Sequence, residues 1–117
     1  NRYDGSPQIN NSGEVVWVRE GEIYLYDGTT VTQLTDNSRY DESPQINNSG
    51  EVVWCGRSGG YENDLEIFIY NGAITTRLTD NNKSDMFPQI NDSGEVVWYS
   101  TKPDAEDVGV GGGDVGG

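Results

Sequence analysis

Short stretches of alternating apolar and polar residues run along most of the chain, and each ends at a cluster of Gly, Asn, Asp or Ser. Alternating β-branched and aromatic residues between such turn clusters are typical of half-buried β-strands. No window has the apolar i, i+3, i+4, i+7 spacing of an amphipathic helix. Over the first part of the chain the pattern therefore predicts four strands, at residues 7–10, 14–17, 22–26 and 32–35.

This pattern is repeated along the chain. Three copies of a first block lie at residues 6–17, 43–54 and 87–98, and two copies of a second block lie at 22–37 and 66–81. The first two copies of the first block are identical, and the third has Phe87 and Asp92 in place of Ser and Asn. The two periods are 37 and 44 residues, because the second unit has seven more residues between its second and third strands. Fixed periods of this length indicate a repeat architecture.

Each unit combines four short antiparallel strands, which matches one blade of a β-propeller. The Asn-Asn-Ser-Gly turn between the first two strands, and Asp27-Gly28 between the last two, predict tight hairpins with a left-handed Gly. A sandwich is the alternative, but only stacked blades need identical strand pairs at a fixed register. We therefore expect an all-β segment of tandem four-stranded antiparallel propeller blades, two complete and one half. The expected parts are blade 1 at 1–42, blade 2 with the loop insertion at 43–86, a half-blade at 87–100 and a Gly/Asp-rich tail or linker at 101–117.

A longer motif runs through the repeats: a Leu-Thr pair, an Asp, a Pro, a Gly-containing turn and an apolar strand. It is clearest at residues 76–98 and 34–54, and the first copy keeps Asp4, Pro7 and the hairpin. Over residues 1 to about 100 the chain resembles the TolB-type, or WD-like, propeller repeat of periplasmic and extracellular bacterial proteins. The resemblance implies a propeller fold and an extracellular or periplasmic location. Such repeats occur in translocation accessory proteins, serine peptidases and uncharacterised secreted proteins.

The chain is strongly acidic, with a net charge of −13 over 117 residues. Such a charge repels phosphate backbones and anionic lipid, so we expect no nucleic-acid partner. No run approaches the roughly 18 apolar residues of a membrane span. The chain has no histidine and a single cysteine, Cys55, which we expect to be a buried free thiol. Without the commonest general base and metal ligand, we expect neither catalytic residues nor an enzyme activity in this chain.

Blade topology indicates where a ligand would bind. The loops between blades, and those between second and third strands, lie at one end of each blade, and the hairpin turns lie at the other. Loops of variable length on a rigid repeat scaffold are where binding usually resides. The first end carries the seven-residue insertion and an Asp three residues before each Pro. The candidate binding face consists of Asp4, Asp41, Asp85, Arg57, Tyr61, Glu62 and Asp64.

The repeated aspartates have a structural alternative, because a carboxylate can accept backbone N–H groups and fix a turn. Calcium needs six to eight oxygen ligands, and one loop offers too few. We therefore expect no cofactor, with calcium at Asp4, Asp41 and Asp85 as the alternative. The repeated tryptophans are expected in the core between blades rather than on a stacking surface; they are Trp17, Trp54 and Trp98.

Two and a half blades cannot close a ring, which needs four to eight. We expect either a longer repeat array, which the ends inside a motif favour, or several copies that share blades, for instance three chains giving six. The predicted function is a non-catalytic propeller segment that serves as a binding or assembly scaffold for a protein or a carbohydrate. The alternative is the propeller domain of a larger secreted enzyme, such as a serine peptidase, whose catalytic part lies outside this chain.

Overall fold

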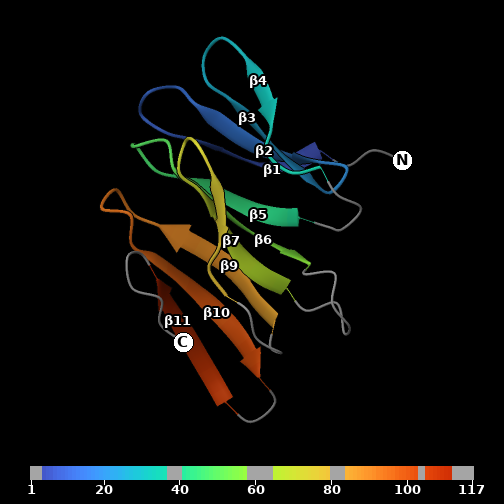
Figure 1. Cartoon of the computed structure of the whole chain (residues 1–117), viewed down its shortest axis with the longest axis vertical. Helices are drawn as coiled ribbons and strands as arrows, with labels where there is room; N and C mark the ends of the chain where they lie inside the picture. Colours follow the sequence, from blue (N-terminus) through green and yellow to red (C-terminus); the bar gives the residue numbers. More distant parts are fainter. Residues whose placement is uncertain (1–3, 37–40, 58–64, 80–83, 103–104, 112–117) are drawn as a thin grey trace.

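A computed structural model describes residues 4–36, 41–57, 65–79, 84–102 and 105–111. Within these ranges the chain forms eleven strands and no helix (Figure 1). The strands are β1 (Asp4–Ile9), β2 (Val15–Arg19), β3 (Glu22–Tyr26), β4 (Val31–Gln33), β5 (Asp41–Ile46), β6 (Val52–Arg57), β7 (Leu65–Tyr70), β8 (Thr75–Arg77), β9 (Ser84–Ile90), β10 (Val96–Lys102) and β11 (Ala105–Gly111).

The strands form three antiparallel sheets, which lie one on another in chain order (Figure 1). The first sheet has the order β1-β2-β3-β4 and the second the order β5-β6-β7-β8. The predicted all-β fold of tandem four-stranded antiparallel sheets is confirmed. The predicted turn geometry is also confirmed, since Gly13 and Gly50 adopt φ angles of 84° and 85°, and Gly28 adopts 100°. Only glycine reaches these values without steric cost from a Cβ atom.

The third sheet differs from the predicted half-blade. It has three strands among the described residues, in the order β11-β10-β9. Residues 105–111, expected to be part of a tail or linker, pair with β10 over its whole length, from Lys102↔Ala105 to Val96↔Gly111. The linker prediction is therefore wrong for these residues, whereas residues 112–117 lie outside the described part. Backbone pairing along the edge of β10 needs no apolar side-chain period, which is why the pattern of residues did not predict this strand.

The first strand of each sheet in chain order (β1, β5 and β9, called the inner strands below) has a bulge next to its proline. The pairing of β1 with β2 shifts between Gly5 and Gln8, and that of β5 with β6 shifts between Glu42 and Gln45. The residue before the proline has a positive φ angle in all three copies; these are Ser6 at 53°, Ser43 at 58° and Phe87 at 55°. A bulge admits proline because the extra residue leaves the hydrogen-bond ladder. The motif's proline thus lies where the strand pairing shifts in β1, β5 and β9.

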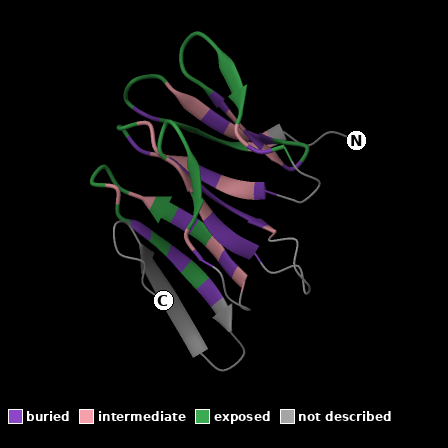
Figure 2. Cartoon of the chain, in the orientation of Figure 1, coloured by how far each residue is buried: buried purple, intermediate pink, exposed green. Residues whose placement is uncertain are grey.

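Two apolar cores lie between the sheets. The first joins Val16 and Val18 of the first sheet to Val52 and Trp54 of the second. The second joins Val53 and Cys55, on the opposite side of β6, to Val96 and Trp98 of the third sheet. Alternate residues of β6 therefore serve two different cores, and Figure 2 shows the buried positions along the facing strands. This arrangement is that of stacked blades, in which each sheet buries one face against the next.

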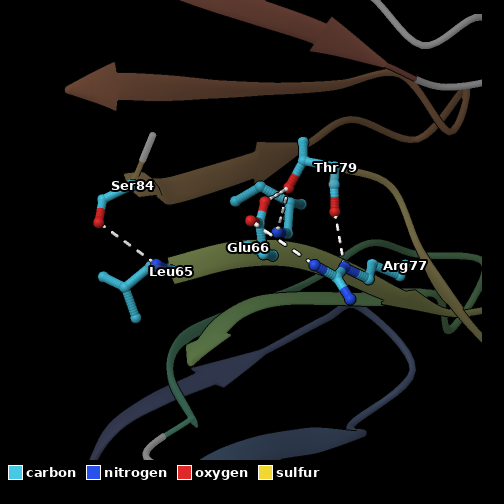
Figure 3. A network of polar contacts seen from close by, with 6 residues as sticks. Leu65, Glu66, Arg77, Thr79 and Ser84 are labelled. Atoms are coloured by element: carbon cyan, nitrogen blue, oxygen red, sulfur yellow. Dashed lines mark hydrogen bonds and ion pairs between the residues drawn. The ribbon is translucent and has the colours of Figure 1, made fainter. Parts of the chain in front are cut away.

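The repeated Leu-Thr pair follows the last strand of a four-stranded sheet (β4 or β8, called the outer strand below). It hydrogen-bonds this end of the sheet to the preceding strand, β3 or β7. Thr79 Oγ1 accepts the N–H of Ile67 at 2.9 Å and donates to Glu66 Oε1 at 2.5 Å. Figure 3 shows the Glu66 carboxylate between Thr79 and Arg77, whose Nη2 lies 3.7 Å from Glu66 Oε2. In the first sheet, Thr35 makes the same two contacts with the equivalent residues Ile23 and Glu22. The motif therefore has a structural role at this position.

Candidate functional site

Two of the three repeated aspartates, Asp41 and Asp85, lie inside the stack rather than on an open surface. Asp41 at the start of β5 is 3% exposed, and Asp85 near the start of β9 is fully buried. The Asp41 N–H donates to the carbonyl of Gly21 in the first sheet at 2.8 Å, and Asp85 Oδ1 accepts from the Ser100 hydroxyl. Asp4 begins β1, and its side chain is outside the described residues. Asp41 thus joins the second sheet to the first, and Asp85 joins β9 to β10.

The rest of the predicted binding face is described in part. Arg57 ends β6 and is half-buried, one residue beyond Gly56, the pairing partner of Asp41. The structure therefore brings Arg57 and the start of β5 to the same end of the second sheet. The insertion residues Tyr61, Glu62 and Asp64 lie outside the described residues. Their role remains a prediction from sequence.

Metal binding finds little support in the described part of the chain. There, no three carboxylate, thiol or imidazole groups come together to hold an ion. Asp85 Oδ2 is buried and accepts no hydrogen bond from the described residues. A single carboxylate oxygen supplies far fewer than the six to eight ligands of calcium. The calcium alternative stays a prediction that only a titration decides.

Cys55 is a free thiol in the core between the second and third sheets. Burial away from water raises the pKa of this thiol to about 11. At neutral pH the group is therefore protonated, whereas a nucleophilic cysteine needs a thiolate. The side chain fills space between sheets and contributes no reactive group to the surface.

The hairpin turns at the opposite end of the blades are tightly organised. Asn10 Oδ1 accepts the N–H groups of Ser12 at 3.0 Å and Glu14 at 2.9 Å, and its Nδ2 donates to Glu14 Oε1 at 2.7 Å. Asn47 and Asn91 make the same three contacts in their own turns. The asparagine side chain thus closes each turn in the manner of an Asx-turn.

These turns are also hydrogen-bonded to one another across the sheets. Asn10 Nδ2 donates to the carbonyl of Asn47, and Asn47 Nδ2 donates to that of Asn91, both at 2.9 Å. The N–H of Asn11 donates to Asn48 Oδ1 at 2.7 Å, and the N–H of Asn48 donates to Asp92 Oδ1 at 2.9 Å. We call the three turns at residues 10–13, 47–50 and 91–94 the turn ladder. The sequence signal for it was the invariant Asn at the start of each turn.

In the described part of the chain, no further sheet covers the outer face of the first sheet or that of the third. On the first sheet the side of β2 that faces away from the second sheet carries Trp17, which is half-buried and stacks on Tyr24 with ring centroids 5.8 Å apart. On the third sheet the outward side of β10 carries Val97 and Tyr99, which are 40% and 49% exposed. Trp54 and Trp98 by contrast lie in the two cores. Of the three tryptophans predicted to lie between blades, Trp17 is the one on an open face.

A hollow of about 290 Å³ lies on the open side of the third sheet, at the turn-ladder end. Its lining consists of Gln89, Ile90, Asn91, Glu95 and Val97. No sequence pattern marked these residues as a site, because the same residue types recur at the equivalent positions of the other two units.

The fold and the repeated contacts define an all-β protein built from consecutive propeller blades. No protein-family model matches the chain, and no curated protein matches it. Among solved structures, the chain is similar to a TolB-like protein from Agrobacterium tumefaciens, with a TM-score of 0.73 and 21% sequence identity. The match covers 100% of this chain and 47% of the other, so the chain spans about half the length of that structure. The chain therefore has a TolB-like β-propeller fold.

In the part of the chain that the structure describes, no helix is long and apolar enough to cross a membrane.

Proposed function

We propose that the chain is a non-catalytic scaffold that binds a protein or a carbohydrate through one end of its blades. The observation that carries this proposal is the difference between the two ends. At the turn-ladder end, backbone and side-chain groups are used in contacts within and between turns. The other end carries the loops between sheets and the seven-residue insertion. We therefore expect the ligand-binding side chains to lie on these loops.

Charge narrows the class of ligand. A chain with net charge −13 attracts a basic protein surface and repels nucleic acid. The insertion combines Tyr61 with the acidic residues Glu62 and Asp64. An aromatic ring beside carboxylates suits either a basic peptide or a sugar, which presents apolar ring faces and hydroxyl donors. An extracellular or periplasmic location follows from the TolB-type resemblance and belongs to the same proposal.

A second candidate function is a propeller domain within a larger secreted enzyme. It is favoured by one observation: the chain spans 47% of the structure it resembles, so it has the size of part of a propeller protein. The sequence flanking these residues in the gene tests this candidate. A neighbouring domain with a catalytic triad would favour it, and flanking propeller repeats alone would oppose it.

Binding is tested with a glycan array and a library of immobilised basic and acidic peptides. For any probe that binds, we expect the triple variant Tyr61→Ala, Glu62→Ala and Asp64→Ala to weaken affinity at least about tenfold, or roughly 1.4 kcal/mol. The matched control replaces three exposed serines of the turn ladder, Ser12, Ser49 and Ser93, with alanine. Equal loss from both triple variants, or from neither, would contradict a binding site at the loop end.

A further inference from the structure

We propose that the open face of the first sheet binds the open face of the third sheet in a second copy of the chain, so that two copies close a ring of six sheets. This inference rests on the proposed scaffold function and names its partner. The two interfaces inside the chain show how each of these faces is covered when a neighbouring sheet is present. The same repeat positions are left uncovered at the two outer faces.

The open face of the first sheet matches a covered face of the second. Residues 6–17 and 43–54 have identical sequences. Ile46 is partly buried against the first core and Trp54 is 1% exposed, whereas the equivalent Ile9 is 68% exposed and the equivalent Trp17 is half-buried. An apolar face with this composition is stable in water when another sheet covers it.

The open face of the third sheet matches the faces that provide this cover. Val97 stands at the repeat position of Val16 and Val53, both of which are fully buried between sheets. Tyr99 stands at the position of Val18 and Cys55, which are buried as well. The outward side of β10 is therefore equivalent to the sides of β2 and β6 that pack on the next sheet.

The hollow on the third sheet indicates the register of this contact. At the internal interfaces, Glu14 Oε1 lies 3.3 Å from the Cβ position of Gly50, and Glu51 Oε1 lies 3.3 Å from that of Gly94. Each glutamate thus covers the turn of the next sheet. The third glutamate, Glu95, lines the hollow instead. The first turn has no such cover, because no atom of the described residues lies within 4 Å of the Cβ position of Gly13. We infer that turn 10–13 of a second copy occupies the hollow.

The polar groups at the two ends of the turn ladder are complementary. Inside the chain, an asparagine Nδ2 donates to the carbonyl of the next turn, and the following N–H donates to the next side-chain oxygen. The third turn repeats these donors as Asn91 Nδ2 and the N–H of Asp92, and the first turn repeats the acceptors as the Asn10 carbonyl and Asn11 Oδ1. Docking of a second copy would extend the ladder by one identical step.

The described residues form three sheets, so a ring built only from copies of this 117-residue chain contains a multiple of three. Closed propellers have four to eight blades, and six is the one multiple of three in that range. Two copies related by a two-fold axis cover both open faces of each chain and leave neither free to polymerise. The strand β11 is decisive here, because it makes the third repeat a sheet in its own right. For an assembly of copies of this chain, we therefore propose two chains with three sheets each instead of three chains with two blades each, whereas the expectation of a longer repeat array stays a prediction.

The test is the mass of the full chain in solution, measured by light scattering and sedimentation over a range of concentrations. We expect twice the chain mass of 12.9 kDa, with the dimer favoured by salt, because each copy carries a charge of −13. Ile9→Lys and Val97→Glu each place a charge on one open face, and we expect each to weaken the dimer at least about tenfold. Ile74→Glu, at an exposed position in the turn between β7 and β8, is the matched control and should leave the dimer intact.

Mixing the two variants distinguishes this interface from others. Ile9→Lys and Val97→Glu together leave one interface unaltered and oppose Lys to Glu across the other, so the mixture should form a dimer that neither variant forms alone. A wild-type monomer at all concentrations, open-ended polymers, or a dimer that resists both variants would overturn the proposal. The triple variant at Tyr61, Glu62 and Asp64 separates it from the binding function, since that variant should keep the dimer mass. A monomer that still binds its probe would disprove the dimer alone.

Discussion

Trp17 and Trp54 end two identical stretches of twelve residues, and yet they lie in different surroundings. Trp54 is buried in the core between the first and second sheets, whereas Trp17 is half-buried on the outer face of the first sheet. Each tryptophan stacks on the aromatic residue opposite it on the next strand, Tyr24 or Phe68. The local structure of the strand pair is therefore the same in both units. The neighbouring sheet decides whether the side chain is buried.

The largest effect is expected from truncating the two tryptophans. Trp54→Ala should lower the free energy of unfolding by about 3–5 kcal/mol, because it leaves a cavity in a closed core. Trp17→Ala should cost about 1 kcal/mol, since solvent already reaches its site. Urea unfolding measures both, in the Ile9→Lys background so that the outer face stays open. Equal costs would mean that the first sheet is covered after all.

The next largest difference in unfolding free energy is expected between Thr79 and Thr35, the threonines that follow the outer strands. Thr79→Val removes two hydrogen bonds and leaves Glu66, which is 1% exposed, without one of its partners. We expect a loss of about 2–3 kcal/mol, typical of a buried polar group that loses its partner. Thr35→Val should cost about 1 kcal/mol, because Glu22 is half-buried and can turn to water. Thermal melting of the two variants tests this, and a larger loss for Thr35→Val would contradict it.

The turn ladder allows a finer comparison. Asn47 accepts a hydrogen bond from Asn10 and donates one to Asn91, whereas Asn91 is exposed at the last turn. We expect Asn47→Ala to cost about 2 kcal/mol and Asn91→Ala about 1 kcal/mol, the difference being the donated bond between sheets. Chemical unfolding of the monomeric Ile9→Lys chain with each change measures it. Equal values would show that the bonds between turns add nothing to those within them.

The smallest effect is the pH dependence of one step in this ladder. Hydrogen bonds from the backbone and side chain of Asn48 lower the pKa of Asp92 from its usual value of 3.8. A lowered pKa means a stabilising contribution that is complete above about pH 4 and is lost as the pH falls through the folded-state value. Asp92→Asn should therefore flatten the acid limb of the stability curve slightly, and Asp92 is exposed, so the change is small. Melting temperatures between pH 6 and 2 test the sign.

Much of this fold could be predicted from the repeat. The first unit was expected to have strands at 7–10, 14–17, 22–26 and 32–35, and the structure has β1 to β4 over closely similar ranges. Strand β11 could not be predicted in this way, because Gly-rich residues pair through backbone groups that carry no sequence pattern.

The candidate site was less predictable than the fold. Asp41 and Asp85 were expected on the binding face because they lie near loops, and the structure buries both at the start of an inner strand. Sequence position shows the end of the blade on which a residue lies but not its depth, which depends on how closely the inner strands approach. The open faces and the hollow were missed for a related reason, since residues that are identical in sequence differ only in what covers them.

The turn ladder and the two cores join only neighbouring sheets, and this has a consequence for how the chain unfolds. The second sheet is bounded on both sides, whereas the first and third are each bounded on one. In such a linear array the outer members separate first, and stability is close to a sum of single-sheet and nearest-neighbour contributions. In the monomeric Ile9→Lys chain, amide hydrogen exchange should accordingly be slowest in β6 and β7 and faster toward both ends. Unfolding then starts at the outer sheets and proceeds inward, and its cooperativity increases with the number of sheets.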